Sequence, residues 1–142
     1  MEMKSAIIHI DGPDKTGKDS IRREVVKATK GQSLVYVRSF LSQIVYSRLY
    51  NRKIDEHWFF DKWKLAMQLG EKFFFIDCSY EIIKERFMKH NEQDLDIKDW
   101  KTHRRAFYDV LKEAENKGIK IKRIDTTIDK PLVSAKLVIE GK

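Results

Sequence analysis

Two glycines and a lysine near the start of the chain have the spacing of a phosphate-binding loop. The segment reads Gly12-Pro13-Asp14-Lys15-Thr16-Gly17-Lys18. In this pattern the glycines let successive backbone N–H groups turn toward an anion, and the lysine reaches the outer phosphates of a nucleotide. A pattern this short also arises by chance, so its value depends on the flanking residues. The alternative is a strand-to-helix turn that uses two glycines and binds nothing.

The flanking residues favour the phosphate-binding interpretation. An apolar run of strand length at 6–10 precedes the loop, and apolar residues follow it at helical spacing, namely Ile21, Val25 and Val26. A helix that begins there directs its free N–H groups and the positive end of its dipole at the same anion. Lys18 at a helix start opposes that dipole unless an anion is bound. A turn without a ligand therefore explains the lysine poorly.

The residues after the lysine are unusual for a magnesium-dependent site. A Ser or Thr hydroxyl normally follows the lysine and ligates magnesium, but here Asp19 is followed by Ser20. Asp19 could bind Mg²⁺ through its carboxylate, or Ser20 through its hydroxyl, and Asp11 could assist through water. Asp19 also suits the first turn of a helix without any metal, because the dipole stabilises an acid there. Both interpretations of Asp19 stay open.

The rest of the chain alternates strand and helix patterns. Further strands are predicted at 34–37, 73–76 and 119–124, and helices at 40–51, 59–69, 80–90, 97–117 and from 131 onward. The polar stretch 91–96 is predicted to be a loop. The order βαβααβααβα predicts an α/β fold, a three-layer sandwich with helices on both faces of a small, mostly parallel sheet of about four strands. The loop at 12–18, placed between the first strand and the first helix, makes the expected fold one of the P-loop NTPase type.

Three charged residues outside the loop are expected at the same site. Ligands of open parallel sheets bind outside the carboxyl ends of the strands, and Arg38 and Asp77 each stand at such an end. We expect Arg38 to clamp an anion beside Lys18, and Asp77 to help a metal through water. Arg86, on the helix that follows Asp77, is placed to close over the phosphates as part of a lid.

Composition limits the class of protein. The 142 residues fit one domain, 1–142, and 42% hydrophobic with 36% charged residues is typical of a globular chain. No apolar run approaches the ~20 residues of a membrane span, and the N-terminus lacks a signal-peptide pattern. We therefore expect a cytoplasmic protein, in the host cytoplasm if the chain is phage-encoded, with no membrane partner.

The net charge, the cysteine content and the histidine spacing limit which partners and metal sites the sequence predicts. The net charge of +7 suits nucleotides, nucleic acid or both, but the basic residues are scattered, so charge alone does not argue for DNA. The single cysteine, Cys78, excludes an internal disulfide and is expected to be an inert core thiol. The four histidines are too widely spaced to indicate a hydrolytic metal centre.

These residues resemble the thymidylate kinase family of nucleoside monophosphate kinases over most of the chain. The segment 11–18 resembles that family's acid-Gly-x-Asp-x-x-Gly-Lys loop, and Arg38, Ser42 and Tyr46 repeat its Arg-x-x-x-Ser-x-x-x-Tyr spacing. The apolar strand with Asp77, the lid-helix start and the adenine-side loop at 124–127 are also similar. The Gly-Lys-Asp-Ser variant looks more like phage-type deoxynucleoside monophosphate kinases.

The resemblance implies transfer of phosphate from ATP, with Mg²⁺, to a deoxynucleoside monophosphate. The residues expected at the donor are Gly12, Pro13, Asp14, Lys15, Thr16, Gly17, Lys18, Asp19, Ser20, Arg86 and Thr126. Those expected at the acceptor are Asp14, Arg38, Ser42 and Tyr46. The catalytic residues would be Lys18, Lys15, Arg38 and Asp14, and the metal ligands Asp19, Ser20 and Asp11.

Two departures from the family leave alternatives open. Val37 replaces an acidic residue that the family uses near the metal, and only about ten polar residues separate the first helix from Leu34, where the family has a base-binding strand and helix. The acceptor could instead be carried on DNA, as a modified base or a 5′ hydroxyl, or the chain could bind nucleotides without turnover. The expected partners are nucleotide substrates, with DNA and a second copy of the chain as open alternatives.

Overall fold

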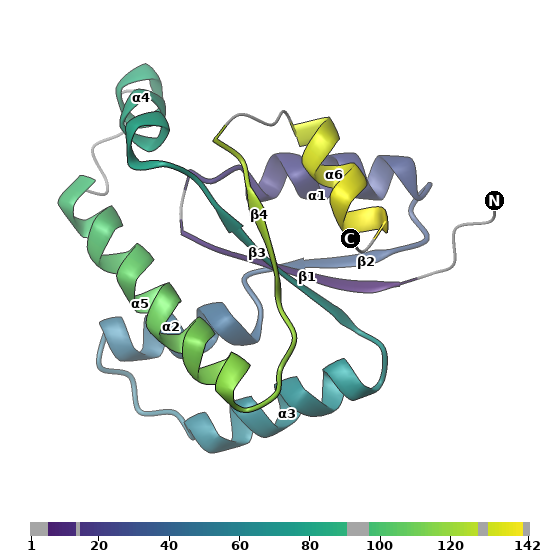
Figure 1. The fold of residues 1–142 in the computed structure, drawn as a ribbon, viewed down its shortest axis with the longest axis vertical. Helices are drawn as coiled ribbons and strands as arrows, with labels where there is room; N and C mark the ends of the chain where they lie inside the picture. Colours follow the sequence, from purple (N-terminus) through teal and green to yellow (C-terminus); the bar gives the residue numbers. More distant parts are fainter. Residues whose placement is uncertain (1–5, 14, 91–96, 128–130, 141–142) are drawn as a thin grey trace.

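The computed structural model describes residues 6–13, 15–90, 97–127 and 131–140, and they form an α/β fold (Figure 1). The elements, in chain order, are β1 (Ile7–Asp11), α1 (Lys18–Ala28), β2 (Leu34–Val37), α2 (Phe40–Leu49), α3 (Glu56–Gln68), β3 (Lys72–Asp77), α4 (Tyr80–His90), α5 (Ile97–Asn116), β4 (Lys122–Asp125) and α6 (Pro131–Glu140). This is the predicted order. The predicted loop at 91–96 lies outside the described residues.

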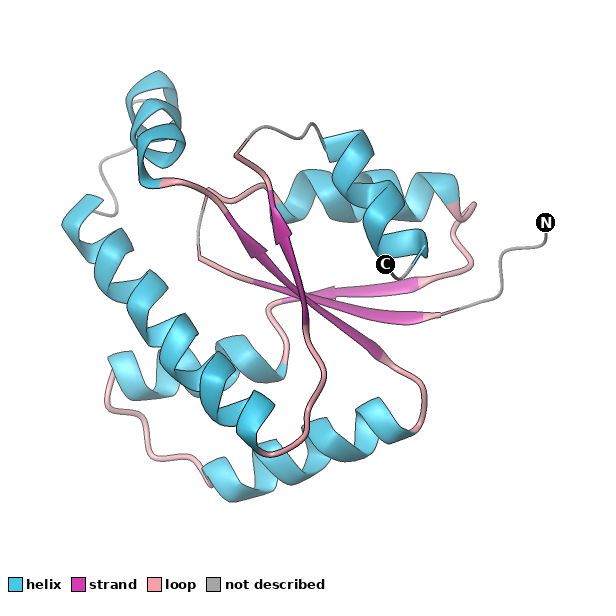
Figure 2. Ribbon diagram, viewed as in Figure 1, coloured by secondary structure: helices cyan, strands magenta, loops and turns pink. Residues whose placement is uncertain are grey.

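The sheet is parallel and has the strand order β2-β1-β3-β4. Helices α1 and α6 cover one face, and α2, α3 and α5 cover the other (Figures 1 and 2). Helix α4 lies beyond the carboxyl end of β3. The predicted three-layer α/β architecture, with helices on both faces of a parallel four-stranded sheet, is confirmed. Because the described strands run the same way, the segments that follow them emerge at one edge of the sheet.

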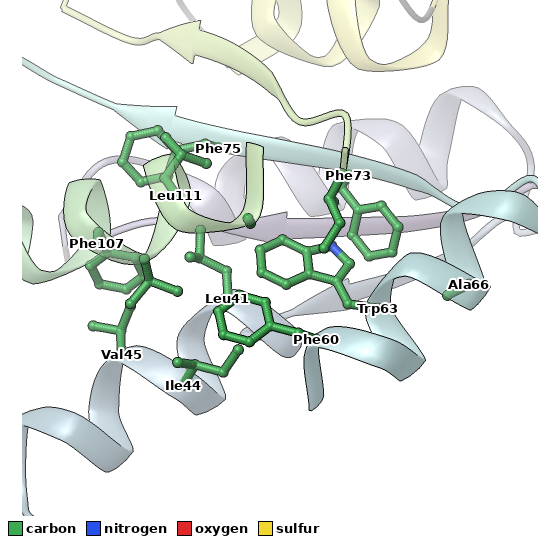
Figure 3. Packing of buried hydrophobic residues seen from close by; sticks show 13 residues of the cluster. Leu41, Ile44, Val45, Phe60, Trp63, Ala66, Phe73, Phe75, Phe107 and Leu111 are labelled. Atoms are coloured by element: carbon green, nitrogen blue, oxygen red, sulfur yellow. The ribbon is translucent and has the colours of Figure 1, made fainter. Parts of the chain in front are cut away.

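The two layers of helices bury different faces of the same strands. Along β3, Phe73 and Phe75 pack with α2, α3 and α5, whereas Phe74 and Ile76 pack with α1 and α6. This alternation follows from the two-residue period of a strand. In the first cluster the ring of Trp63 stacks on Phe60 and meets Phe73 edge-on (Figure 3). The central strand is thus covered on both sides and holds its carboxyl end in a fixed position.

The last strand is shorter than predicted. It covers Lys122–Asp125, so Ile119 and Ile121 lie before it. The N–H of Ile119 donates to the Ala114 carbonyl, and Gly118 has φ +89°, an arrangement that ends a helix. The side chain of Ile119 is buried against α5 and its neighbours. Ile119 is therefore apolar because its side chain packs at the end of α5, and not because it belongs to the strand.

Among the residues described, none of the helices combines the length and apolarity that a membrane span requires.

Candidate active site

The loop between β1 and α1 contains residues in the left-handed conformation, which anion-binding turns use. Lys15 and Gly17 adopt left-handed conformations, with φ +67° and +98°. Left-handed residues within a turn direct neighbouring N–H groups to one side. Gly17 is the N-cap of α1, and no described side chain caps that first turn. A helix start of this kind, at the carboxyl edge of a parallel sheet, suits an anion.

Gly12 allows the loop to pass close to β3. A Cβ at this position would lie 2.2 Å from the carbonyl oxygen of Ile76, a backbone atom that cannot move aside. Gly12 also has φ +154°, which disfavours other residues. The first glycine of the pattern is therefore required by the approach of the loop to the neighbouring strand.

Lys18 lies across the loop. Its side chain is buried, and Nζ donates hydrogen bonds to the carbonyls of Gly12 at 2.5 Å and Pro13 at 2.7 Å. Thr16, also buried, donates from Oγ1 to the same Pro13 carbonyl at 2.8 Å. An ammonium group held in this way provides a fixed positive charge beside the first turn of α1. Asp14 lies outside the described residues.

Arg86 and Thr126 join the loop to two distant segments. Arg86, on α4, donates from Nη1 to the Lys15 carbonyl at 2.5 Å and from Nη2 to the Thr126 carbonyl at 3.3 Å. The Thr126 hydroxyl donates to the Thr16 carbonyl at 2.6 Å and lies 3.0 Å from the Asp77 carbonyl. The structure thus brings together the predicted donor residues of three segments that lie far apart in the sequence.

Asp11 binds the start of α2. Its Oδ1 accepts hydrogen bonds from the N–H of Ser39 at 2.6 Å, the N–H of Ser42 at 3.2 Å and the Ser42 hydroxyl at 2.6 Å. Burial raises the pKa of the Asp11 carboxyl, and the hydrogen bonds from Ser42 and Ser39 oppose that shift. Asp11 therefore satisfies the first N–H groups of α2. Of the other predicted metal ligands, Asp19 is exposed and Ser20 half-buried.

Three of the four predicted acceptor residues, all but Asp14, lie in the turn after β2 or on α2. Arg38 is exposed and left-handed, with φ +70°, and its N–H donates to the Ile10 carbonyl at 3.1 Å. Ser42 is buried against Asp11. Tyr46 is half-buried between α2 and α5, and its ring contacts are Tyr50, His103 and Phe107. Ser42 and Tyr46 thus face structural neighbours, while Arg38 reaches the surface.

Asp77 forms a polar cluster with α5 that sequence reasoning missed. Arg104 donates from Nε and Nη2 to the two carboxylate oxygens of Asp77, each at 2.9 Å, and the Tyr108 hydroxyl also donates to Asp77. Burial raises the pKa of the Asp77 carboxyl, but the hydrogen bonds from Arg104 and Tyr108 outweigh burial, and the net pKa is lowered. One signal was available, because Arg104 is a basic residue on an otherwise apolar helical face.

A second set of polar contacts at the start of α2 was also missed. His9 of β1 lies 2.5 Å from the Ser39 hydroxyl through Nδ1 and 2.6 Å from a Glu71 carboxylate oxygen through Nε2. The available signal was a histidine inside the apolar run of a buried strand.

The described residues do not hold a metal site built from protein alone. Within residues 6–13, 15–90, 97–127 and 131–140, no group of three or more His, Cys, Asp or Glu side chains could bind a metal ion. Magnesium at phosphate-transfer sites commonly takes one or two carboxylates together with substrate phosphates. Asp19, exposed, and Ser20, half-buried, lie in the first turn of α1 and are the predicted ligands that could contribute to such an ion.

Comparison with known proteins supports the fold. No protein-family model matches the sequence, and no curated protein matches it either. Among solved structures, the YorR protein of Bacillus subtilis, solved in complex with phosphorylated GDP, matches with a TM-score of 0.80 over 95% of this chain and 94% of that chain, at 16% sequence identity. A likeness at this identity shows a shared fold. The resemblance to thymidylate kinases stays a prediction.

Proposed function

We propose that this protein transfers a phosphoryl group from ATP to a deoxynucleoside monophosphate. The observation that carries the proposal is the buried ammonium of Lys18, held on the carbonyls of Gly12 and Pro13 beside a left-handed turn and a helix start. A cation in this position opposes the dipole of α1 unless an anion binds there. The YorR protein, which has the same fold, was solved with a nucleotide.

Phosphoryl transfer requires chiefly positioning and charge stabilisation from a protein. The loop would hold the donor phosphates through its N–H groups, and Lys18 and Lys15 would lie over the β and γ oxygens. Arg38 would bind the acceptor phosphate, with Asp14 and Tyr46 near the acceptor sugar. The bond from the γ phosphorus to the bridging oxygen breaks, an acceptor phosphate oxygen forms the new bond, and ADP leaves.

Charge neutralisation would come from two further sources. Asp19, Ser20 or Asp11, together with the donor phosphates, would hold magnesium, which would supply charge compensation at the transferred group. Arg86 is already within hydrogen-bond distance of the loop backbone, through the Lys15 carbonyl. A short movement of its guanidinium would bring it to a bound phosphate.

ADP release, coupled to a spectroscopic reaction, tests the proposal with a panel of nucleoside and deoxynucleoside monophosphates, guanine nucleotides included. We expect turnover with at least one deoxynucleotide. Lys18→Met retains the buried alkyl chain and should lose most of that turnover, since it removes the ammonium. Lys27→Met, at an exposed position of the same helix, is the matched control and should behave as the unmodified chain does. No turnover with any acceptor would exclude the kinase.

A second candidate is a nucleotide-binding protein without turnover. Val37 stands where an acidic residue would assist the metal, and the Asp77 carboxylate is engaged by Arg104 and Tyr108. Both observations reduce the acidic groups available for magnesium. ATP binding that Lys18→Met abolishes, without transfer to any monophosphate or to a DNA oligonucleotide with a 5′ hydroxyl, would favour this candidate. Transfer to the oligonucleotide alone would instead identify a DNA-borne acceptor.

A further inference from the structure

His9 is a buried polar residue in the middle of the sheet. It lies on β1, is 5% exposed, and its ring stacks between Tyr36 of β2 and Phe73 of β3, with ring centroids 5.2 and 4.5 Å away. Both neighbours are its register partners in the sheet. Aromatic residues fill such positions without a polar cost, so a histidine there requires partners for its two nitrogens.

Both nitrogens have partners, and these partners come from opposite directions. Nε2 lies 2.6 Å from Oε1 of Glu71, in the turn before β3, and Nδ1 lies 2.5 Å from the hydroxyl of Ser39. An ionised carboxylate only accepts hydrogen bonds, so Nε2 carries a proton. In the neutral ring Nδ1 then accepts, and the Ser39 hydroxyl donates to it. Glu71, His9 and Ser39 thus form a continuous chain of hydrogen bonds.

Ser39 is held at a second atom as well. Its N–H donates to Oδ1 of Asp11 at 2.6 Å, so residues of β1 bind both its backbone and its side chain. The preceding residue, Arg38, has φ +70°, a conformation that costs free energy in residues other than glycine. Such a conformation persists only where its surroundings hold it. The bonds at Ser39, and the Arg38 N–H on the Ile10 carbonyl, supply that restraint.

We propose that His9 and Glu71 are positioning residues for Arg38. Through Ser39 they hold the turn in the conformation from which the Arg38 guanidinium meets the acceptor phosphate. The proposal rests on the proposed function, because it assigns Arg38 to the acceptor. It goes beyond that function because it assigns a role to a buried chain of hydrogen bonds on the face of the sheet away from α1. This chain sets the affinity for the acceptor and not the affinity for the donor. Donor binding depends on other residues.

Steady-state kinetics with each substrate varied in turn tests whether the hydrogen bonds of His9 affect acceptor binding without affecting donor binding. His9→Phe keeps a flat ring between Tyr36 and Phe73 and removes both hydrogen bonds. Only the bond to Ser39 holds the Arg38 turn directly, so the KM for the acceptor should rise about tenfold, the factor expected for the loss of that one hydrogen bond. The KM for ATP should stay unchanged. Ser39→Ala should reproduce this pattern. Glu71→Gln should remain near the unmodified chain, because an amide oxygen still accepts from Nε2.

One control and one substitute variant distinguish a loss of positioning from a loss of folding. Tyr36→Phe alters the other ring of the stack and leaves the hydrogen bonds in place, so both KM values should stay unchanged. If His9→Phe does not fold, Glu71→Ala provides the second variant, because the Glu71 side chain is 22% exposed and lies at a turn. An unchanged acceptor KM in the folded variants, or equal increases in both KM values, would overturn the proposal.

Direct binding measurements distinguish this proposal from the kinase assignment. Calorimetric titration with a deoxynucleoside monophosphate should show affinity about tenfold weaker in His9→Phe. If the unmodified chain binds the monophosphate without turnover and His9→Phe weakens that binding, the positioning role stands and the kinase fails. If the unmodified chain turns over and the His9→Phe affinity equals its own, the positioning role fails alone. A chain that binds no monophosphate overturns both.

Discussion

Asp11 combines a structural role, which the hydrogen bonds show, with a proposed role at the metal. Its buried carboxylate satisfies three donors at the start of α2, and burial raises its pKa. A raised pKa in a carboxyl means that the fold disfavours the ionised form, so at neutral pH the charge itself costs stability. The oxygen atom is needed for the helix, whereas the charge is not. Substitutions that keep or remove the oxygen can separate the two roles.

We predict opposite effects of two substitutions at this position. Asp11→Asn keeps an oxygen for the same three donors without a buried charge, so its free energy of unfolding at pH 7 should equal or exceed that of the unmodified chain. Asp11→Ala leaves the N–H groups of Ser39 and Ser42 unpaired and should lower it by about 1–3 kcal/mol. Urea unfolding measures both. If Asp11 binds magnesium, Asp11→Asn should lose turnover while it keeps its stability. Equal destabilisation by both variants would contradict this account.

The residues that the sequence predicted and those that it missed differ in how local their partners are. The loop at 12–18 is a pattern within seven residues, and some of its hydrogen bonds, such as that of Lys18 with Gly12, lie within it. The partners of Asp77 and His9 lie elsewhere, with Arg104 27 residues away and Glu71 62 residues away. No periodicity links such pairs. Only the packing of helices against the sheet brings them together.

At the scale of elements, the contact of β3 with α5 also joins segments that lie far apart in the sequence. The bidentate pair of Arg104 with Asp77 joins the carboxyl end of β3 to the middle of α5. Helix α5 also packs along α2, through Phe107 and Tyr46. One ion pair thus helps to position α5, the helix that packs against the proposed acceptor residue Tyr46.

The pH dependence of stability should report this ion pair. Hydrogen bonds from Arg104 and Tyr108 lower the pKa of Asp77 in the fold despite burial, so the folded state binds its proton less readily than the unfolded chain does. The stability from the pair is therefore complete above the ordinary aspartate range, about pH 4. It is lost as the pH falls through the lowered pKa.

We predict that Arg104→Met lowers the free energy of unfolding at pH 7 by about 1–2 kcal/mol, a modest value because the Arg104 side chain is 34% exposed. The difference from the unmodified chain should shrink as the pH falls below about 4, and it should be lost once the pH passes the lowered pKa at which Asp77 of the unmodified chain is protonated as well. Denaturant unfolding at a series of pH values measures it. Arg105→Met, at the adjacent exposed position, is the control. A difference that grows as the pH falls would contradict the assignment.

Helices and strands were predicted most reliably where the spacing of apolar residues alone determined the type of element. Alternating strand and helix patterns indicated the parallel sheet, and the doubly apolar β3 indicated its central place. The strand order was outside what periodicity can predict, because order depends on which strands pair across the sheet. The start of β4 was predicted too early, because the apolar side chain of Ile119 packs at the end of α5 and is not part of the strand.

At the scale of the whole molecule, the site is a meeting of segments that follow different strands. The loop after β1, the turn after β2, helix α4 after β3 and Thr126 after β4 all emerge at the carboxyl edge of the sheet (Figure 1). Hydrogen bonds link three of them, since Arg86 reaches the Lys15 and Thr126 carbonyls and Thr126 reaches Thr16. A nucleotide bound there should therefore stabilise the whole fold, and not the loop alone.

Thermal unfolding with and without ATP and magnesium tests this coupling. ATP at about a hundred times its Kd should stabilise the fold by about 2.7 kcal/mol, which corresponds to a rise in Tm on the order of 10 °C. Arg86→Ala removes the two bonds that tie α4 to the loop and to Thr126, so its Tm without nucleotide should fall by several degrees, and its rise with the same ATP concentration should be smaller. Arg22→Ala removes the same charge from an exposed position on α1 and should change neither value. Of these two arginines, only Arg86 contacts both the loop and the segment after β4. Identical Tm values and ATP responses in the two variants would therefore contradict the proposed coupling between α4 and the loop.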